Sequence, residues 1–179
     1  MKKDSQNLVQ QMVPRVVTWY QENQRSLPWR QDKNPYTIWI SEIMLQQTRI
    51  EAVKGYYARF LQEIPDVRTL AEIPEERLLK LWEGLGYYNR AKNLQKAAQI
   101  MVKNYQEEMP KTYAELIQLP GIGEYTAGAI ASIAYDEPVP AVDGNVMRVI
   151  TRLLDWKIDI LEPKTKKEIQ AILQPQMPK

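Results

Sequence analysis

The amino-acid sequence predicts an all-α protein. Apolar residues recur at helical spacing along most of the chain, and no segment shows the convincing alternation of apolar and polar residues that marks a half-buried strand. Prolines and glycines divide this pattern, which predicts many short helices. With 179 residues, 44% of them hydrophobic, the chain can form one domain or two small lobes around a real core.

A helix, a loop and a second helix are expected first. The polar, proline-broken loop covers residues 25–35, and residues 37–47 form a strongly apolar helix interrupted by Ser41 and Glu42. The helix before the loop is amphipathic, with an apolar face made of Leu8, Met12, Val16, Trp19 and Tyr20.

Prolines and a capping box delimit the next two helices. Thr48 and Glu51 form a T-x-x-E box, which predicts a helix start there, and Pro65 ends that helix. Pro74 is expected at the first position of a short helix that runs to Trp82.

The remaining helices follow G-L-G-Y-Y. Pro138 and Pro140 make an extended link, a helix begins after Gly144, and a last amphipathic helix follows Pro163. Before the link, a long helix over about 89–105 is expected to bury one face, comprising Ala91, Leu94, Ala98, Met101 and Tyr105.

Between these elements, the string L-P-G-I-G-E-Y-T-A-G-A-I at residues 119–130 predicts a helix, a tight hairpin and a second helix. Thr112 and Glu115 form a capping box for a short helix that ends near Gln118. The second helix is expected over 124–134.

Two glycines give this hairpin a possible function. Gly121 helps to stop the first helix, and Gly123 is expected to adopt backbone angles that other residues avoid. Without side chains, their N–H groups and the positive end of the next helix can approach a phosphate closely. Such a contact positions a duplex without reading its sequence. Taken alone, the two glycines are more often an ordinary helix connection, and the specificity lies in the whole twelve-residue string.

Composition restricts the chemistry. The chain has no cysteine, so these residues offer no disulfide, no cysteine-ligated zinc and no iron–sulfur ligands. It has no histidine either, so acid–base chemistry falls to carboxylates, lysine or tyrosine. We expect a cytoplasmic protein without membrane association, because no signal peptide or membrane span is apparent. The net charge of +2 permits nucleic-acid binding without arguing for it.

Two carboxylates stand out by context. Glu42 lies within an apolar helix, where burial would raise its pKa as a general acid requires. Asp143 precedes a helix start, where backbone N–H groups favour the ionised form. This pairing suits glycosidic bond cleavage. Taken singly, Glu42 could be a solvated residue and Asp143 a plain N-cap.

Five motifs carry a family resemblance. Between Leu27 and Leu154 the chain contains L-P-W-R, S-E-I-M-L-Q-Q-T-R, W-E-G-L-G-Y-Y-N-R-A, L-P-G-I-G-E-Y-T-A-G-A-I and V-D-G-N-V-M-R. Through them it resembles the catalytic half of MutY-type adenine DNA glycosylases, in the helix-hairpin-helix superfamily that includes endonuclease III. The resemblance implies a helix-hairpin-helix DNA glycosylase fold with two helical lobes.

The resemblance implies catalytic roles for four residues. Glu42 matches the acid that protonates the flipped adenine, and Asp143 matches the aspartate that stabilises positive charge on the deoxyribose. Tyr125 and Asn145 match residues near that sugar. In endonuclease III-like enzymes a lysine occupies the position of Tyr125 and forms a Schiff base. The tyrosine therefore implies a monofunctional glycosylase.

The resemblance also implies contacts to DNA. Arg25, Trp29 and Leu45 match the adenine pocket, whereas Gln47 and Tyr87 match groups that wedge into the base stack beside a flipped nucleotide. The implied partner is double-stranded DNA with adenine opposite 8-oxoguanine or guanine, in base excision repair. Ordinary packing is an alternative for Trp29 and Tyr87.

The chain departs from the family at its C-terminal end. Relatives usually continue into helices with four cysteines around a [4Fe-4S] cluster, then into a domain that helps to recognise oxoguanine. We expect this chain to be a truncated piece or an unusually short member without a cofactor of its own. By analogy, residues 25–136 form a six-helix domain, and 1–24 plus 137–179 form an incomplete second lobe.

Other properties remain open. Relatives often hold a monovalent cation at the hairpin, and we expect no other metal. A monomer is the expected state, although apolar surface on an incomplete lobe would favour self-association, which size-exclusion chromatography would detect. The alternative to the enzyme is a DNA-binding fragment without turnover. A carbohydrate glycosidase would fit two carboxylates but gives the phosphate clamp no role.

Overall fold

The computed structural model of the protein describes residues 2–178, and every regular element in that range is a helix, which confirms the all-α prediction. No helix among these residues is both long enough and apolar enough to cross a membrane. The elements are α1 (Lys2–Asn23), η1 (Pro28–Arg30), α2 (Pro35–Leu45), α3 (Ile50–Glu63), α4 (Val67–Glu72), α5 (Glu75–Trp82), α6 (Asn89–Asn104), α7 (Tyr113–Leu116), α8 (Glu124–Tyr135), α9 (Gly144–Leu153), α10 (Pro163–Leu173) and η2 (Gln174–Gln176).

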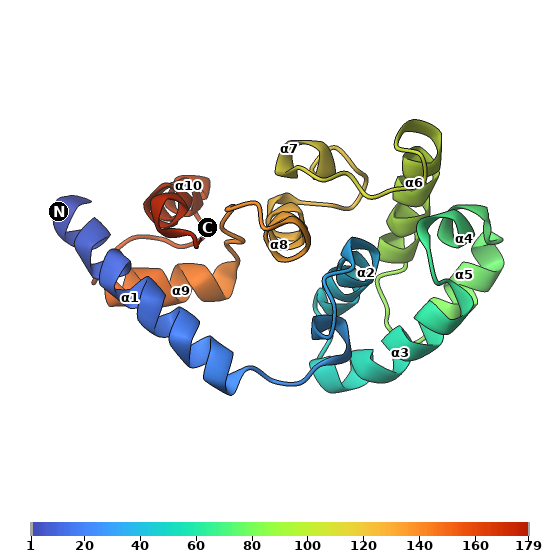
Figure 1. Ribbon diagram of the computed structural model, residues 1–179, viewed down its shortest axis with the longest axis horizontal. Helices are drawn as coiled ribbons and strands as arrows, with labels where there is room; N and C mark the ends of the chain where they lie inside the picture. The colour runs from blue at the N-terminus through green and yellow to red at the C-terminus, as the bar shows by residue number, and fades with distance from the viewer. Residues whose placement is uncertain (1, 179) are drawn as a thin grey trace.

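The helices form two groups (Figure 1). Helices α2 to α6 lie at one side and α1, α9 and α10 at the other, with α8 between them and packed against α2. The loop after α1 joins the two groups at one edge, and the link after α8 joins them again. The expected six-helix range, 25–136, contains seven α-helices among the described residues.

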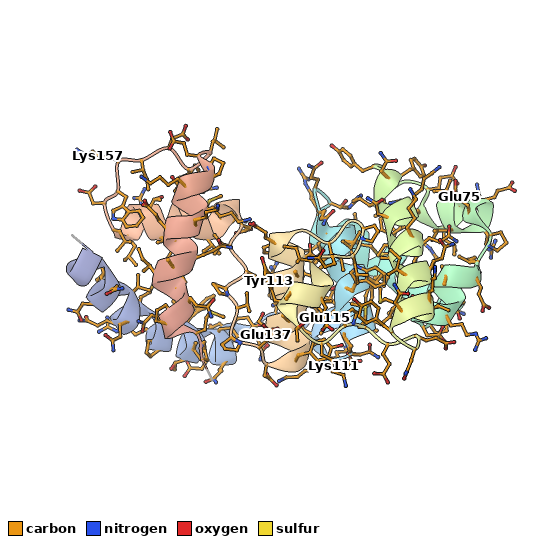
Figure 2. The ribbon with its side chains drawn as sticks, turned by 90° about the horizontal axis from the view of Figure 1, so that it is seen from above. Glu75, Lys111, Tyr113, Glu115, Glu137 and Lys157 are labelled. Carbon is orange, nitrogen blue, oxygen red and sulfur yellow. The ribbon has the colours of Figure 1, made fainter. Side chains whose placement is uncertain are left out.

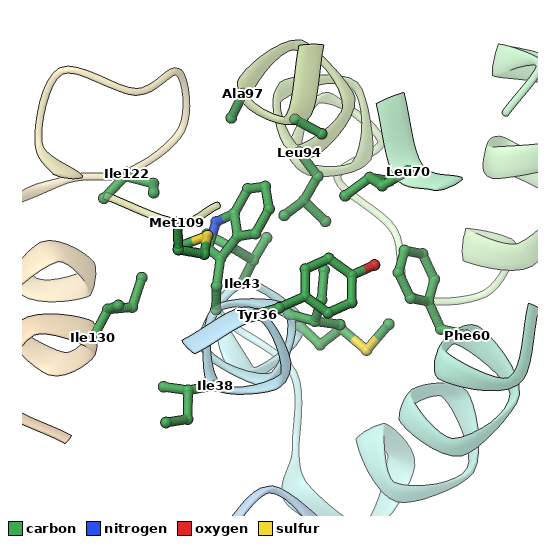
Figure 3. Packing of buried hydrophobic residues seen from close by; sticks show 14 of the residues in the cluster. Tyr36, Ile38, Ile43, Phe60, Leu70, Leu94, Ala97, Met109, Ile122 and Ile130 are labelled. Carbon is green, nitrogen blue, oxygen red and sulfur yellow. The ribbon is translucent and has the colours of Figure 1, made fainter. Parts of the chain in front are cut away.

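The first group surrounds a large hydrophobic core centred on α2. This helix is apolar on nearly all sides, so it is stable only where other helices cover it. Figure 3 shows Tyr36 and Ile43 of α2 lying between Phe60 of α3, Leu94 of α6 and Ile130 of α8. The Tyr36 hydroxyl donates to the Ile64 carbonyl at 2.8 Å, so its polar end is satisfied.

The second group has a much smaller core. It comprises Val142, Ile150 and Ile169, with partly buried apolar residues from α1, α9 and α10 packed around them. Along the predicted apolar face of α1, Val16 and Trp19 are exposed. Local helix formation in this group follows the sequence, whereas burial of the helix faces is incomplete.

Several predicted helix boundaries need correction. The helix expected over 37–47 is Pro35–Leu45, because the Asn34 side chain accepts from the Tyr36 and Thr37 backbone N–H groups and starts it earlier. A helix absent from the sequence prediction, α4, begins at Val67 and is capped by Asp66, whose carboxylate accepts from the Thr69 N–H at 2.7 Å. Tyr105, expected on the buried face of α6, is half-buried as its C-cap.

The two predicted capping boxes differ in outcome. Thr112 caps α7 as expected, since its hydroxyl accepts from the Glu115 N–H at 3.3 Å. The box at Thr48 and Glu51 is wrong. Helix α3 begins with Arg49 as N-cap and no side-chain cap, while the Thr48 hydroxyl donates to the Gln46 carbonyl. Pro74 is likewise an N-cap and not a first helical residue.

The hairpin forms as predicted, but the unusual backbone angles expected at Gly123 occur at Gly121 instead. Gly121 has the positive φ of +77°, and a Cβ there would lie 2.8 Å from Asn93 Cβ. Gly123 is the N-cap of α8 at φ −89°, so the expectation of unusual backbone angles there is wrong. A Cβ on Gly123 would meet nothing within 4 Å, which leaves that side of the N-cap open.

Candidate active site

A carboxylate on the most buried helix forms the centre of the candidate site. Glu42 extends from α2 and is half-buried. Burial raises its pKa, and the neighbouring Asp143 charge raises it further. A hydrogen bond with Tyr125 and the charge of Arg30 oppose this shift. The net upward direction favours the protonated carboxyl that the sequence predicted for a general acid.

The Tyr125 side chain comes from the first turn of α8, directly after the hairpin. Its hydroxyl lies near the Glu42 carboxyl, close enough for each group to shift the pKa of the other. Burial raises the pKa of Tyr125, and the charges of Glu42 and Asp143 raise it further. The phenol therefore stays protonated at neutral pH and can donate a hydrogen bond.

A second carboxylate starts α9. Asp143 is the N-cap, and its side chain accepts from the Val146 N–H at 2.8 Å and from Asn145 Nδ2 at 3.0 Å. The plain N-cap interpretation thus describes its local geometry. The same carboxylate is close enough to influence the pKa values of Glu42 and Tyr125. One residue therefore shapes the helix start and the electrostatics of the site.

Arg30 is a site residue that the sequence interpretation missed. It lies at the end of η1, within L-P-W-R, and its guanidinium lies over the Tyr20 ring of α1 at 5.6 Å. Its positive charge lowers the pKa of Glu42 and that of Tyr125 against the dominant effect of burial. Its membership of a quoted motif did not indicate that its charge acts on Glu42.

The three residues predicted for an adenine pocket occupy different environments. Arg25 lies in the exposed loop after α1. Trp29 is only 5% exposed and meets the Tyr57 ring edge-on, with centroids 5.3 Å apart. Leu45 is half-buried at the end of α2. The packing interpretation of Trp29 therefore describes its observed position, and the pocket assignments stay predictions.

The two predicted wedge residues are both exposed and both have left-handed backbone angles. Gln47 follows α2 with φ 57°, and Tyr87 precedes α6 with φ 48°. The Tyr87 side chain is 65% exposed. Ordinary burial therefore does not account for Tyr87, although its ring lies 5.6 Å from the guanidinium of Arg90.

Ion pairs and caps hold the hairpin beside the site. Lys166 of α10 pairs with Glu124, the residue before Tyr125, at 2.6 Å. Figure 2 shows Glu137 near Tyr113 at the start of α7, where its carboxylate accepts from the Tyr113 backbone N–H at 2.7 Å. The first contact ties the start of α8 to α10, and the second joins the two ends of the α7–α8 unit to each other.

The residues present do not fit an iron–sulfur cluster, because the chain contains no cysteine or histidine to ligate one. Within residues 2–178, no group of three acidic, cysteine or histidine side chains could hold a metal ion. A monovalent cation at the hairpin carbonyls stays a prediction.

Comparisons with known proteins agree with this geometry. Residues 40–177 match a model described as HhH-GPD superfamily base excision DNA repair protein. The adenine DNA glycosylase of Buchnera aphidicola subsp. Baizongia pistaciae is 42% identical over 160 residues, which cover 88% of this chain and 46% of that protein. The mouse adenine DNA glycosylase is 45% identical over 147 residues, covering 77% and 28%. The chain thus spans less than half of either relative.

Solved structures share the fold. A thermostable thymine-DNA glycosylase has a TM-score of 0.80 at 23% identity, covering 96% of this chain and 79% of that one. A trapped endonuclease III–DNA covalent intermediate has a TM-score of 0.79 at 25% identity, covering 97% and 78%. These likenesses confirm the predicted helix-hairpin-helix glycosylase fold.

Proposed function

The chain belongs to the HhH-GPD superfamily of base excision DNA repair proteins, and we propose that it hydrolyses the N-glycosidic bond of adenine in duplex DNA. The proposed substrate is adenine opposite 8-oxoguanine or guanine. Relatives named adenine DNA glycosylase support the base, but they extend well beyond this chain, so the activity of these residues alone is part of the proposal.

One observation carries the proposal. Glu42, Tyr125 and Asp143, from three separate helices, converge so that one carboxyl is pushed towards its neutral form beside a second carboxylate held at a helix N-terminus. Hydrolysis of an N-glycosidic bond uses an acid for the leaving base and an anion beside the developing positive charge. A module that only binds DNA needs neither group.

The proposed sequence balances without a cofactor. Protonated Glu42 gives its proton to a ring nitrogen of adenine, and the bond from C1′ to the base breaks with its electron pair leaving on adenine. Asp143 stabilises the positive charge that develops on the sugar. A water molecule adds to C1′, and its proton returns to Glu42. The products are free adenine and an abasic site.

Tyr125 determines the proposed subclass. A lysine amine can attack the sugar and form an imine, which leads to strand cleavage, whereas a phenol cannot form that imine. The raised pKa of Tyr125 keeps its hydroxyl neutral, so it can donate a hydrogen bond to Glu42. The enzyme should therefore leave an intact strand with an abasic site.

DNA is the proposed partner, held at the hairpin by backbone N–H groups at Gly121, Gly123 and the start of α8. The open space around the Gly123 Cα allows close approach of a phosphate. Binding should weaken as salt rises, because each phosphate contact releases counterions.

Single-turnover excision tests the proposal. With an 8-oxoguanine:adenine duplex, Glu42→Gln should slow adenine release by about 10²–10⁴-fold, because the proton donor is lost. Asp143→Asn should also slow it, whereas Glu51→Gln, an exposed carboxylate on α3, should not. Circular dichroism checks that each variant is folded. Intact adenine release by both site variants would overturn the assignment.

Two further outcomes separate the alternatives. Strands nicked without alkali, or a borohydride-trapped complex through a lysine, would contradict the monofunctional mechanism. Duplex binding without any excision would instead favour a DNA-binding fragment, a candidate motivated by the small core around Asp143 and by the length of the relatives.

A further inference from the structure

The two exposed turns at Gln47 and Tyr87 have strained backbones. Both residues adopt positive φ, at 57° and 48°. A residue with a side chain is sterically disfavoured in this region, so it persists only where its surroundings hold it. The two turns are 40 residues apart in sequence, and a contact shared by both would hold them in this conformation.

One guanidinium bonds to both turns. Arg90, in the first turn of α6, is half-buried between them. Its Nη1 and Nη2 atoms donate to five backbone carbonyls at 2.6–3.2 Å, those of Ile43, Met44 and Gln46 before one turn and of Leu85 and Gly86 before the other. Nη2 also lies 3.4 Å from the Thr48 hydroxyl.

The same guanidinium contacts the exposed residue of the second turn directly. It lies 5.6 Å from the centre of the Tyr87 ring and 5.4 Å from that of the buried Trp82. Arg90 also lines a cavity of about 210 Å³ whose walls include Pro120 and Gly121. The clamp between the turns therefore adjoins the hairpin that is proposed to hold DNA.

We propose that Arg90 is a positioning residue that fixes Gln47 and Tyr87 as one rigid, two-pronged element for insertion into a distorted duplex. This inference rests on the proposed function in taking duplex DNA as the partner, and on the family resemblance in taking Gln47 and Tyr87 as the residues that insert. Unstacking a base costs free energy, and a preorganised pair of side chains offsets this cost without an ordering penalty of its own.

Lysine cannot replace this arrangement. The planar guanidinium presents fixed donors that reach carbonyls on both turns and still contacts two aromatic rings, whereas an ammonium has three donors at one point. Arg90→Lys keeps the charge and most of the stem but removes the bridge. The substitution thus separates the geometry of the clamp from its charge.

A binding cycle on catalytically silent DNA tests the clamp. The ligand is a duplex with a tetrahydrofuran abasic analogue opposite 8-oxoguanine, so no chemistry occurs. With Arg90 present, Gln47→Ala and Tyr87→Ala should each weaken binding about 10-fold, and the double variant should weaken it little further, because coupled residues are not additive. In the Arg90→Lys background, the remaining effects of Gln47→Ala and Tyr87→Ala on binding should become additive.

Arg77→Lys is the matched control, because Arg77 is exposed on α5 and pairs with Glu63. Thermal unfolding and circular dichroism identify variants that lose the fold, and a purely structural Arg90 would lower stability without changing the coupling between the prongs. Three results would each overturn the inference. They are additive effects of Gln47→Ala and Tyr87→Ala on binding with Arg90 present, unchanged coupling between these two substitutions in Arg90→Lys, and no duplex binding by the parent chain. Absent excision with intact coupling would defeat the proposed catalysis and leave the clamp standing.

Discussion

The two helix groups bury very different amounts of apolar surface. Helices α2 to α8 enclose one continuous core, in which the Phe60 and Trp82 rings meet edge-on at 6.0 Å. Helices α1, α9 and α10 pack around a much smaller cluster, built on Val142, Ile150 and Ile169. Stability in a folded chain follows buried contacts, so the two groups should open at different free energies.

The candidate site draws on both groups. Glu42 and Tyr125 are fixed by the large core, whereas Asp143 depends on the position of α9 in the small one. Exposed apolar side chains, including Val16, Trp19 and Val149, lie on the second group. The position of the anion should therefore be the less firmly held part of the catalytic arrangement.

Matched isoleucine substitutions test the comparison with the largest expected effect. Ile130 on α8 and Ile169 on α10 are both fully buried, one in each core. Ile130→Ala should lower the free energy of unfolding by about 2–5 kcal/mol. Ile169→Ala should cost roughly half as much, because a site with few fixed neighbours collapses more completely around the deletion. Urea denaturation measures both.

Hydrogen exchange provides the independent check on this pair. Amides of α10 should exchange through local opening at a lower free energy than amides of α2 and α6. Equal losses from both substitutions, together with equal protection of the two groups, would mean that the chain unfolds as one cooperative unit despite its unequal cores.

The sequence predicted the helices well where local signals decide them, and less well where distant residues compete. Two identical T-x-x-E patterns show this. Thr112 caps its helix, whereas the Thr48 hydroxyl donates to the Gln46 carbonyl and accepts from Arg90. The N-cap of α3 is therefore the next residue, Arg49, which provides no side-chain cap. The competing partner of Thr48 comes from 42 residues away, so no local pattern could reveal it.

The candidate site was predictable only where sequence motifs mark its residues. Glu42, Tyr125, Asp143 and Asn145 all come from recognised motifs, and the structure brings them together. Arg30 affects the same site through space, and nothing in its neighbouring sequence indicates that effect. The effect of a charge on a group distant in sequence depends on tertiary packing, which the spacing of residues in the sequence does not reveal.

Glu42→Gln gives a second test, with a smaller effect on stability than the core substitution. The folded-state pKa of Glu42 is raised above its unfolded value, mainly by burial. Its contribution to stability is therefore fully present below the ordinary glutamate pKa and is lost as pH rises through the folded-state pKa. Glutamine does not titrate, so the variant should gain stability relative to the parent chain across that window.

Unfolding measured from acidic to mildly alkaline pH reveals this as a widening gap between the two stability curves. Glu51→Gln, an exposed substitution on α3, separates the effect of burial from that of an added amide. A gap that narrows with rising pH would show that the surroundings of Glu42 favour its charged form, which would also remove the basis for its role as an acid.

The smallest expected effect concerns the ion pair between the groups. Lys166 of α10 and Glu124 of α8 lie 2.6 Å apart, with side chains 28% and 47% exposed. A double-mutant cycle with Lys166→Ala and Glu124→Gln should give a coupling of about 0.2–1 kcal/mol, because water screens such a partly exposed pair. The coupling should shrink at high salt.

Lys164→Ala is the matched control for this pair, since Lys164 lies on the same helix and its carboxylate neighbour, Glu168, is on that helix too. If the pair helps to hold the second group against the hairpin, Lys166→Ala should also increase exchange of α9 amides near Asp143, and Lys164→Ala should not. A measurable coupling without any change in the exchange of α9 amides would mean that the ion pair does not help to position α9. The position of Asp143 would then depend on the small apolar core and on the 137–143 link.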